Sequence, residues 1–174
     1  EHQRQAAAIL ATTLEDLGDR VALYCFRSDG RHAVQLPAVK TFDQRFGLRE
    51  RGRLAHLRPS GYTRLGAGIR GAAEILKARA GTPHRLLIVL SDGYAYDHGY
   101  EGKYAEADVA KALEEMRADG VACLCLAIGT DLDTGALGRV FGRASLAGAA
   151  TLAELSPRID ELFMSALARL SESR

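Results

Sequence analysis

Residues 84–93 read His-Arg-Leu-Leu-Ile-Val-Leu-Ser-Asp-Gly, and the predicted fold is built around this stretch. The apolar run at residues 86–90 is too short for a helix and is rich in branched side chains. It therefore predicts a strand buried on both faces, as in a parallel sheet. The run ends at Asp92, and Gly93 lets the chain turn away without steric cost. Because open α/β sheets bind their ligands at the carboxyl ends of central strands, Asp92 is a candidate ligand-binding residue, with a simple turn cap as the alternative.

On both sides of this stretch, predicted helices alternate with predicted strands. Apolar spacing predicts helices at residues 3–17, 44–57, 65–80, 105–119 and 133–141, and a last helix that opens at Ser156 and Pro157. Apolar runs predict parallel strands at residues 21–26, 86–90 and 121–128, and a short edge strand is expected at 144–146. Residues 33–39 contain Pro37, which predicts an antiparallel edge strand that forms a hairpin with the strand before it.

This alternation predicts one α/β domain over residues 1–174, with a doubly wound, mostly parallel sheet, one antiparallel edge strand and helices on both faces. The net charge of +1 gives no indication of nucleic-acid binding, and no apolar run reaches membrane-spanning length. Cys25, Cys123 and Cys125 lie in apolar strands without the spacing of a zinc site. They predict reduced thiols in a cytoplasmic protein.

Residues 66–71, Gly-Ala-Gly-Ile-Arg-Gly, match the G-x-G-x-x-G pattern of dinucleotide-binding domains, with Asp92 at about the expected distance. In such domains the glycines form the turn between a strand and a helix. Residues 59–64, Pro-Ser-Gly-Tyr-Thr-Arg, cannot be a central strand. The glycines are therefore predicted to lie inside a helix and to serve packing, and a nucleotide-binding enzyme stays the alternative hypothesis.

Thr63 opens the helix that leads into the strand of Asp92. Since the loops after parallel strands converge at one edge of the sheet, its hydroxyl is expected near the Asp92 carboxylate. Hydroxyl and carboxylate oxygens suit Mg²⁺ or another divalent cation. The alternative for Thr63 is a helix N-cap.

Residues 61–66, Gly-Tyr-Thr-Arg-Leu-Gly, together with residues 86–93, resemble a von Willebrand factor A domain. The continuation at residues 94–103, which includes Asp97, Tyr100 and Glu101, is similar to the type found in CbbO and NorD proteins, which activate rubisco or nitric oxide reductase. The resemblance implies a Rossmann-like fold and a non-catalytic adaptor. It also implies a MoxR-type AAA+ ATPase as partner, and a target enzyme bound through an acidic side chain at the metal.

In that family the metal-ion-dependent adhesion site combines an Asp-x-Ser-x-Ser loop with a Thr and an Asp, and the resemblance places Thr63 and Asp92 in the last two roles. The first element belongs to a strand before the first helix, which residues 1–174 do not contain, through truncation, a chain break or true loss. We expect weak or absent metal binding without that element. We also expect a gap between the strands at 21–26 and 86–90.

Five of the six tyrosines lie in or beside the two loops that flank Asp92: Tyr62, Tyr94, Tyr96, Tyr100 and Tyr104. Tyrosine is enriched at interface hot spots, so these loops predict a contact surface, for which we select Tyr62, Tyr94, Tyr96, Asp97, Tyr100 and Glu101. The alternative is that some of the tyrosines cover the end of the sheet. His98 lies in the same loop without a hydrolase constellation.

Overall fold

A computed structural model describes residues 1–91, 96–128, 134–142, 146–149 and 168. Its main sheet has the strand order β5 (Arg85–Ser91), β6 (Val121–Ile128), β7 (Leu146–Ala149), and both neighbouring pairs are parallel. The predicted parallel pairing of residues 86–90 with 121–128 is confirmed. The expected edge strand at 144–146 is found as β7, which begins at Leu146.

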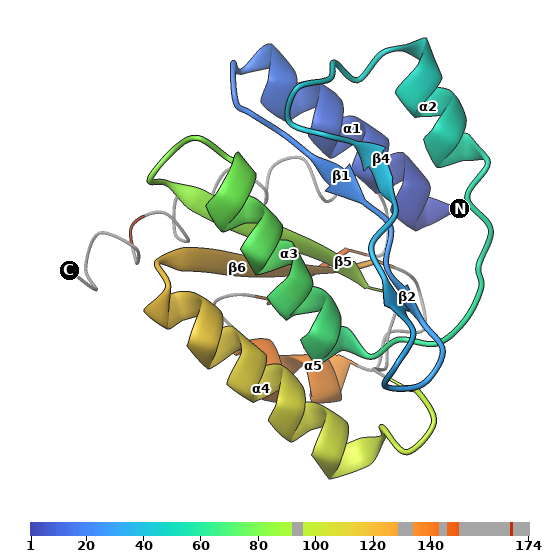
Figure 1. Ribbon diagram of the computed structural model, residues 1–174, viewed down its shortest axis with the longest axis vertical. Helices are drawn as coiled ribbons and strands as arrows, with labels where there is room; N and C mark the ends of the chain where they lie inside the picture. The colour runs from blue at the N-terminus through green and yellow to red at the C-terminus, as the bar shows by residue number, and fades with distance from the viewer. Residues whose placement is uncertain (92–95, 129–133, 143–145, 150–167, 169–174) are drawn as a thin grey trace.

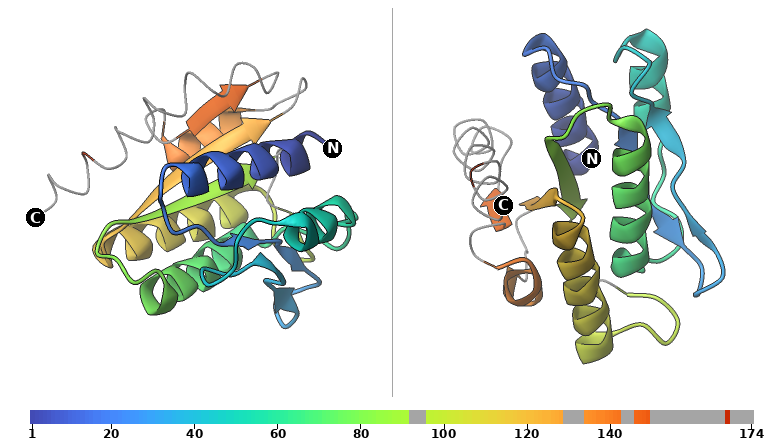
Figure 2. Two further views of the ribbon diagram at one scale, coloured as in Figure 1. Left: turned by 90° about the horizontal axis from the view of Figure 1, so that it is seen from above. Right: turned by 60° about the vertical axis from the view of Figure 1, so that its left-hand side comes forward.

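Alternate residues of β5 and β6 face opposite sides of this sheet, and helices cover both sides (Figure 2). Leu87 and Cys125 pack with α3 (Leu65–Arg79), α4 (Gly102–Ala118) and α5 (Thr134–Phe141). Leu86, Ile88 and Leu126 pack instead with α1 (His2–Asp16). Because both faces are covered, both strands are apolar without alternation. The α/β fold with helices on both faces of a mostly parallel sheet is confirmed.

The predicted helices are found with small shifts at their ends. The largest difference is α2 (Leu48–Ala55), which is shorter at both ends than the predicted helix at residues 44–57. Its N-cap is Gly47, whose backbone N–H donates to the carboxylate of Glu50 at 3.2 Å, so the start of the helix is fixed by a contact with its own first turn. The predicted helix that opens at Ser156 and Pro157 lies outside the described residues.

The segment at residues 21–26 differs from the prediction. It forms the two-residue strand β1 (Leu23–Tyr24), which pairs antiparallel with β4 (Ala38–Lys40) and not with β5. The next strand, β2 (Arg27–Ser28), pairs antiparallel with β3 (Val34–Gln35), so the predicted hairpin is confirmed. The expectation that residues 21–26 form one buried strand parallel to residues 86–90 is wrong, because Leu23 and Tyr24 pair antiparallel with β4 instead.

The outer edge of β5 has no strand partner among the described residues, since that strand pairs only with β6. All seven residues of β5 are accordingly half-buried, whereas all eight residues of β6 are buried. This outer edge lies on the side where the sequence predicts a gap.

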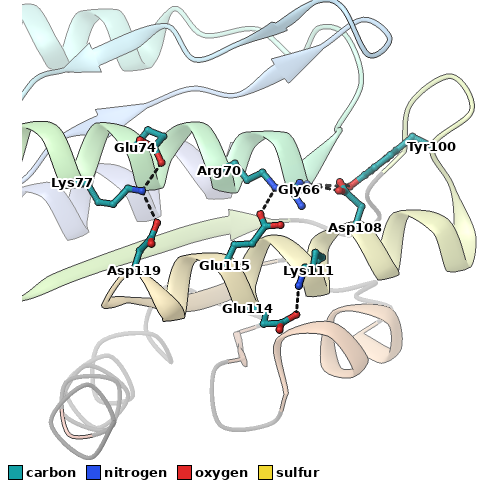
Figure 3. A network of polar contacts seen from close by, with 10 residues as sticks. All are labelled: Gly66, Arg70, Glu74, Lys77, Tyr100, Asp108, Lys111, Glu114, Glu115 and Asp119. Carbon is teal, nitrogen blue, oxygen red and sulfur yellow. Dashed lines mark hydrogen bonds and ion pairs between the residues drawn. The ribbon is translucent and has the colours of Figure 1, made fainter. Parts of the chain in front are cut away.

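Polar pairs fasten α3 to α4 along their length (Figure 3). Arg70 donates to Asp108 at 2.8 Å and to Glu115 at 2.6 Å, and Lys77 lies 2.5 Å from Asp119. These contacts are partly exposed, so each is worth little alone, but together they fix how the two helices lie against each other. The position of α4 along α3 in turn sets where the loop before α4 meets the start of α3.

All three cysteines are free, and Cys123 and Cys125 are buried. Burial raises the pKa of the Cys125 thiol to about 12. These two side chains therefore act as core residues, as the sequence predicts. In the part of the chain that the structure describes, no helix is long and apolar enough to cross a membrane.

Candidate metal and partner-binding site

The site lies where the loop before α3 meets the loop before α4, at the end of the molecule toward which β5 points (Figure 1). The Thr63 backbone N–H donates to the Tyr96 carbonyl at 2.6 Å and joins the two loops. The Tyr62 backbone exchanges hydrogen bonds of 2.7 and 2.9 Å with Ser28 of β2. Thr63 is thus held between the hairpin and the second loop. Asp92 and Tyr94 lie outside the described residues.

The Thr63 hydroxyl makes no hydrogen bond to any residue that the structure describes. The N-cap of α3 is Arg64, and it makes no side-chain capping bond. An N–H group of the first turn has another acceptor, since the Gly66 N–H donates to the Tyr100 hydroxyl at 3.1 Å. The N-cap alternative for Thr63 therefore fails, and its oxygen stays available for a ligand. No three His, Cys, Asp or Glu side chains in the described ranges lie close enough to share a metal ion.

Asp97 is completely buried and organises the second loop. Its carboxylate accepts hydrogen bonds from the backbone N–H groups of Gly30 at 2.9 Å and His98 at 2.7 Å, and from Arg64 Nε at 3.3 Å. Burial alone would raise the pKa of this carboxyl, but the hydrogen bonds from Ser28, these two backbone groups and Arg64 outweigh burial and lower it. Asp97 therefore holds the loop against the β2–β3 hairpin as a charged group.

We predict that this contact weakens in acid. The folded state lowers the Asp97 pKa, so its contribution is complete above the unfolded value of about 4 and is lost as the pH falls through the lower folded value. Asp97→Asn removes this titration. The difference in unfolding free energy between wild type and Asp97→Asn should shrink below about pH 4. Asp29→Asn, at an exposed position of the same hairpin, is the matched control, and a pH-independent difference for Asp97→Asn would contradict the prediction.

Tyr100 is the second internal support of the loop and is 1% exposed. Its hydroxyl donates to Asp108 at 2.7 Å while it accepts from the Gly66 N–H (Figure 3). Its ring lies 4.6 Å from the Arg64 guanidinium. Burial and the neighbouring Asp108 carboxylate raise the pKa of the phenol, so the hydroxyl stays a donor. Sequence reasoning missed Arg64, Asp108 and Ser28 as the partners that position this loop.

The burial of Asp97 and Tyr100 corrects the expectation that both contact a partner directly, because side chains with 0 and 1% exposure cannot do so in this conformation. The exposed residues of the site are different. Tyr96 is 48% exposed, and its ring centroid lies 5.8 Å from that of Tyr62, which in turn lies 4.6 Å from the ring of His98. Glu101, also exposed, is the N-cap of α4.

The glycines of the G-x-G-x-x-G match lie inside α3, not in a strand-to-helix turn. A Cβ at Gly68 would lie 2.8 Å from the Phe26 ring, and one at Gly71 would lie 2.6 Å from Leu36. A Cβ at Gly66 would overlap the Asp108 carboxylate. Each glycine therefore makes room for a neighbouring side chain. The packing interpretation is confirmed, and the geometry that a dinucleotide-binding loop requires is absent at these residues.

The fold and this site define an α/β domain that presents loops at the carboxyl edge of its sheet. The family model for the von Willebrand factor type A domain matches residues 1–156. The chain belongs to the von Willebrand factor A family.

Similar proteins agree with this assignment. The chain is 36% identical over 163 residues to protein NorD of Brucella melitensis and 41% identical over 123 residues to an uncharacterized protein of Pseudomonas aeruginosa. These alignments cover 92% and 69% of the chain but only 25% and 20% of the two relatives, so the chain spans about a quarter of their length or less.

Solved structures share the fold at low sequence identity. Proximal thread matrix protein 1 of the mussel byssus, in a structure with a zinc-occupied adhesion-site motif, has a TM-score of 0.63 at 15% identity. The similarity covers 94% of this chain and 42% of that protein. The pilus adhesin SpaC of Lactobacillus rhamnosus GG also gives 0.63 at 15% identity, over 91% of this chain and 27% of the adhesin.

Proposed function

We propose that this domain is the protein-binding part of a NorD-type adaptor and that it binds its target through a divalent cation. In this proposal Thr63 and Asp92 supply two of the oxygen ligands, with Mg²⁺ as the cation that suits them. The domain itself is non-catalytic. It links a MoxR-type AAA+ ATPase, acting from the cytoplasm, to the enzyme that the ATPase remodels, rubisco or nitric oxide reductase.

The observation that carries the metal part is the hydroxyl of Thr63, which bonds to no side chain or backbone group in the described part of the chain. This residue is held by its backbone on Tyr96, and α3 does not use its side chain as a cap. The main chain of Thr63 fixes its position at the edge where parallel strands end. Its hydroxyl oxygen is therefore suited to bind a metal ion. When bound, the cation supplies an open coordination position for an acidic side chain of the target. The mussel protein with zinc in its adhesion-site motif supports the same use of the fold.

The observation that carries the partner part is the pair of rings at Tyr62 and Tyr96 beside Thr63. Both belong to segments held from behind by buried hydrogen bonds to Ser28 and Asp97, so little conformational entropy is lost when a partner binds. Tyr94 and Glu101 belong to the same proposed surface. Of the two types that the sequence resembles, CbbO and NorD, the similarity to proteins named NorD supports the second.

Titration calorimetry of Mg²⁺ tests the metal part. We expect residues 1–174 alone to bind the ion weakly or not at all. In a protein that also carries the Asp-x-Ser-x-Ser element, we expect wild type and Thr63→Ser, which keeps the hydroxyl, to bind the ion, Thr63→Val to bind it about tenfold more weakly, and Asp92→Ala not to bind it. Thermal unfolding should show that all variants remain folded. Equal Mg²⁺ binding by wild type and Asp92→Ala would contradict the proposed site.

The second arm of this experiment measures binding to the purified MoxR-type ATPase and to the target enzyme with Mg²⁺ and with EDTA. Tyr96→Ala should weaken binding to one of them by roughly 1–3 kcal/mol, because a half-exposed ring at an interface is a hot-spot candidate. It should leave the unfolding temperature nearly unchanged. Tyr104→Ala, at an exposed ring of α4, is the control for loss of an aromatic side chain.

A further inference from the structure

The described surface contains a second group of features that the metal site does not use, on α2. This helix lies at the other end of the molecule from the loop before α4, as Figures 1 and 2 both show. Residues 45–58 hold five arginines and one acidic residue, a net charge of +4 (five minus one), against +1 for the whole chain. The single acid, Glu50, is buried and bonds to the start of its own helix. The outward charge of α2 is therefore entirely positive.

These arginines divide into two groups. Arg51 donates to Thr12 of α1 at 3.0 Å, and Arg53 donates to the Val39 carbonyl of β4 at 3.3 Å, so both attach α2 to the domain. Arg45, Arg49 and Arg58 are exposed, and their guanidinium groups make no hydrogen bond or salt bridge with any residue that the structure describes. The charge of Arg45 helps to lower the pKa of Glu15, but all three guanidinium groups are accessible to a partner.

An apolar side chain lies among them. Leu48, the first residue of α2, is 91% exposed, more than any other large apolar residue described. Leu48 is one of the apolar residues whose spacing predicts the helix at residues 44–57, but it is not buried in the core. The core contacts of the helix come from Leu54 and from Phe46, just before it, which pack against α1 and β4. Leu48 therefore contributes nothing to packing within the domain.

Gly52 lies one turn after Leu48 on the same face. Glycine inside a helix costs about 1 kcal/mol relative to alanine. A Cβ at Gly52 would meet nothing within 4 Å, and the residue does not have positive φ. No contact within the described part of the chain requires glycine here. Because Gly52 has no side chain, a second main chain can approach α2 closely at this position.

We propose that the Leu48–Gly52 face of α2 docks an acidic amphipathic helix of a partner protein. Its carboxylates would pair with Arg45, Arg49 and Arg58, and its apolar side chains would cover Leu48. Its backbone would cross at Gly52. Helix α4 of a second copy fits poorly, because its acids are already paired, Glu114 with Lys111 and Glu106 with Arg139. A nucleic acid bound through its phosphates would offer no apolar side chain to cover Leu48. The proposal does not rest on the metal site.

The probe is a fluorescein-labelled helical peptide with leucines along one face and glutamates on both flanks, measured by fluorescence anisotropy. We expect saturable binding that weakens with salt. Binding should be lost when lysines replace the glutamates and when serines replace the leucines. Gly52→Leu, whose Cβ would meet nothing within 4 Å, should weaken binding about tenfold or more and leave the unfolding temperature unchanged or higher. Arg49→Glu should weaken it to a similar extent.

Two matched variants complete the test. Ala110→Leu adds the same side chain at an exposed position of α4, and Arg79→Glu reverses an exposed charge in α3. Both should bind the peptide as wild type does. Absence of peptide binding, or binding that Gly52→Leu leaves unchanged, would overturn the proposal. Tighter binding of a 20-nucleotide single-stranded DNA, with the same dependence on Arg49, would also overturn it and assign the face to nucleic acid.

Discussion

Replacing Tyr100 with alanine is expected to lower the free energy of unfolding by about 3–5 kcal/mol, the usual cost of removing a buried aromatic ring. The ring is 1% exposed and lies against the Arg64 guanidinium. Its hydroxyl also joins α4 to the first turn of α3, through Asp108 and the Gly66 N–H. Alanine would leave a cavity and remove both hydrogen bonds. Urea unfolding followed by circular dichroism measures the loss.

Tyr100→Phe separates the hydroxyl from the ring. We expect a loss of about 1–3 kcal/mol, because Asp108 keeps its contact with Arg70 while the buried Gly66 N–H loses its partner. Tyr104→Ala, at a side chain that is 61% exposed, is the control and should change stability by less than about 0.5 kcal/mol. If Tyr100→Ala is as stable as wild type but fails to bind the partner, Tyr100 contacts the partner directly and the prediction is wrong.

The sequence predicts the core of this fold well because the signal there is local. A strand covered on both faces must be apolar at every position, which the run at residues 86–90 shows directly. The helix that begins at Leu65 could be predicted for a similar reason. Its glycines have no suitable strand before them, so packing was the better interpretation. In these cases a property of a few consecutive residues decides the structure.

The sequence predicts the loops less well because their residues are decided by distant partners. Asp97 and Tyr100 are polar residues in a polar loop, and their composition suggests a surface. Their burial depends on Gly30 and Arg64 for the first and on Gly66 and Asp108 for the second. No spacing along the chain brings these groups together. The prediction for residues 21–26 is wrong for the same reason, because an apolar run does not show which strand it will pair with.

The second large effect concerns Lys40, which is 1% exposed and so places a cation in the interior. Its ammonium group lies 2.8 Å from the Glu15 carboxylate of α1 and donates to the Val21 carbonyl. The same carboxylate accepts from the Phe46 N–H at 3.0 Å. Burial acts to raise the pKa of Glu15, but Lys40 and this N–H outweigh burial and lower it. The pair joins α1 to β4 and to the segment that leads into α2.

Glu15→Gln is expected to cost about 3 kcal/mol, because it leaves the buried ammonium without a counter-charge. Lys40→Met should cost less, since the Glu15 side chain is 25% exposed and water can solvate the carboxylate that remains. The double variant Glu15→Gln/Lys40→Met should recover part of the loss, since it leaves no buried charge. The three unfolding free energies form a double-mutant cycle. Strictly additive losses would show that the two groups do not interact, and an equal cost for both single variants would contradict the asymmetry argued from their burial.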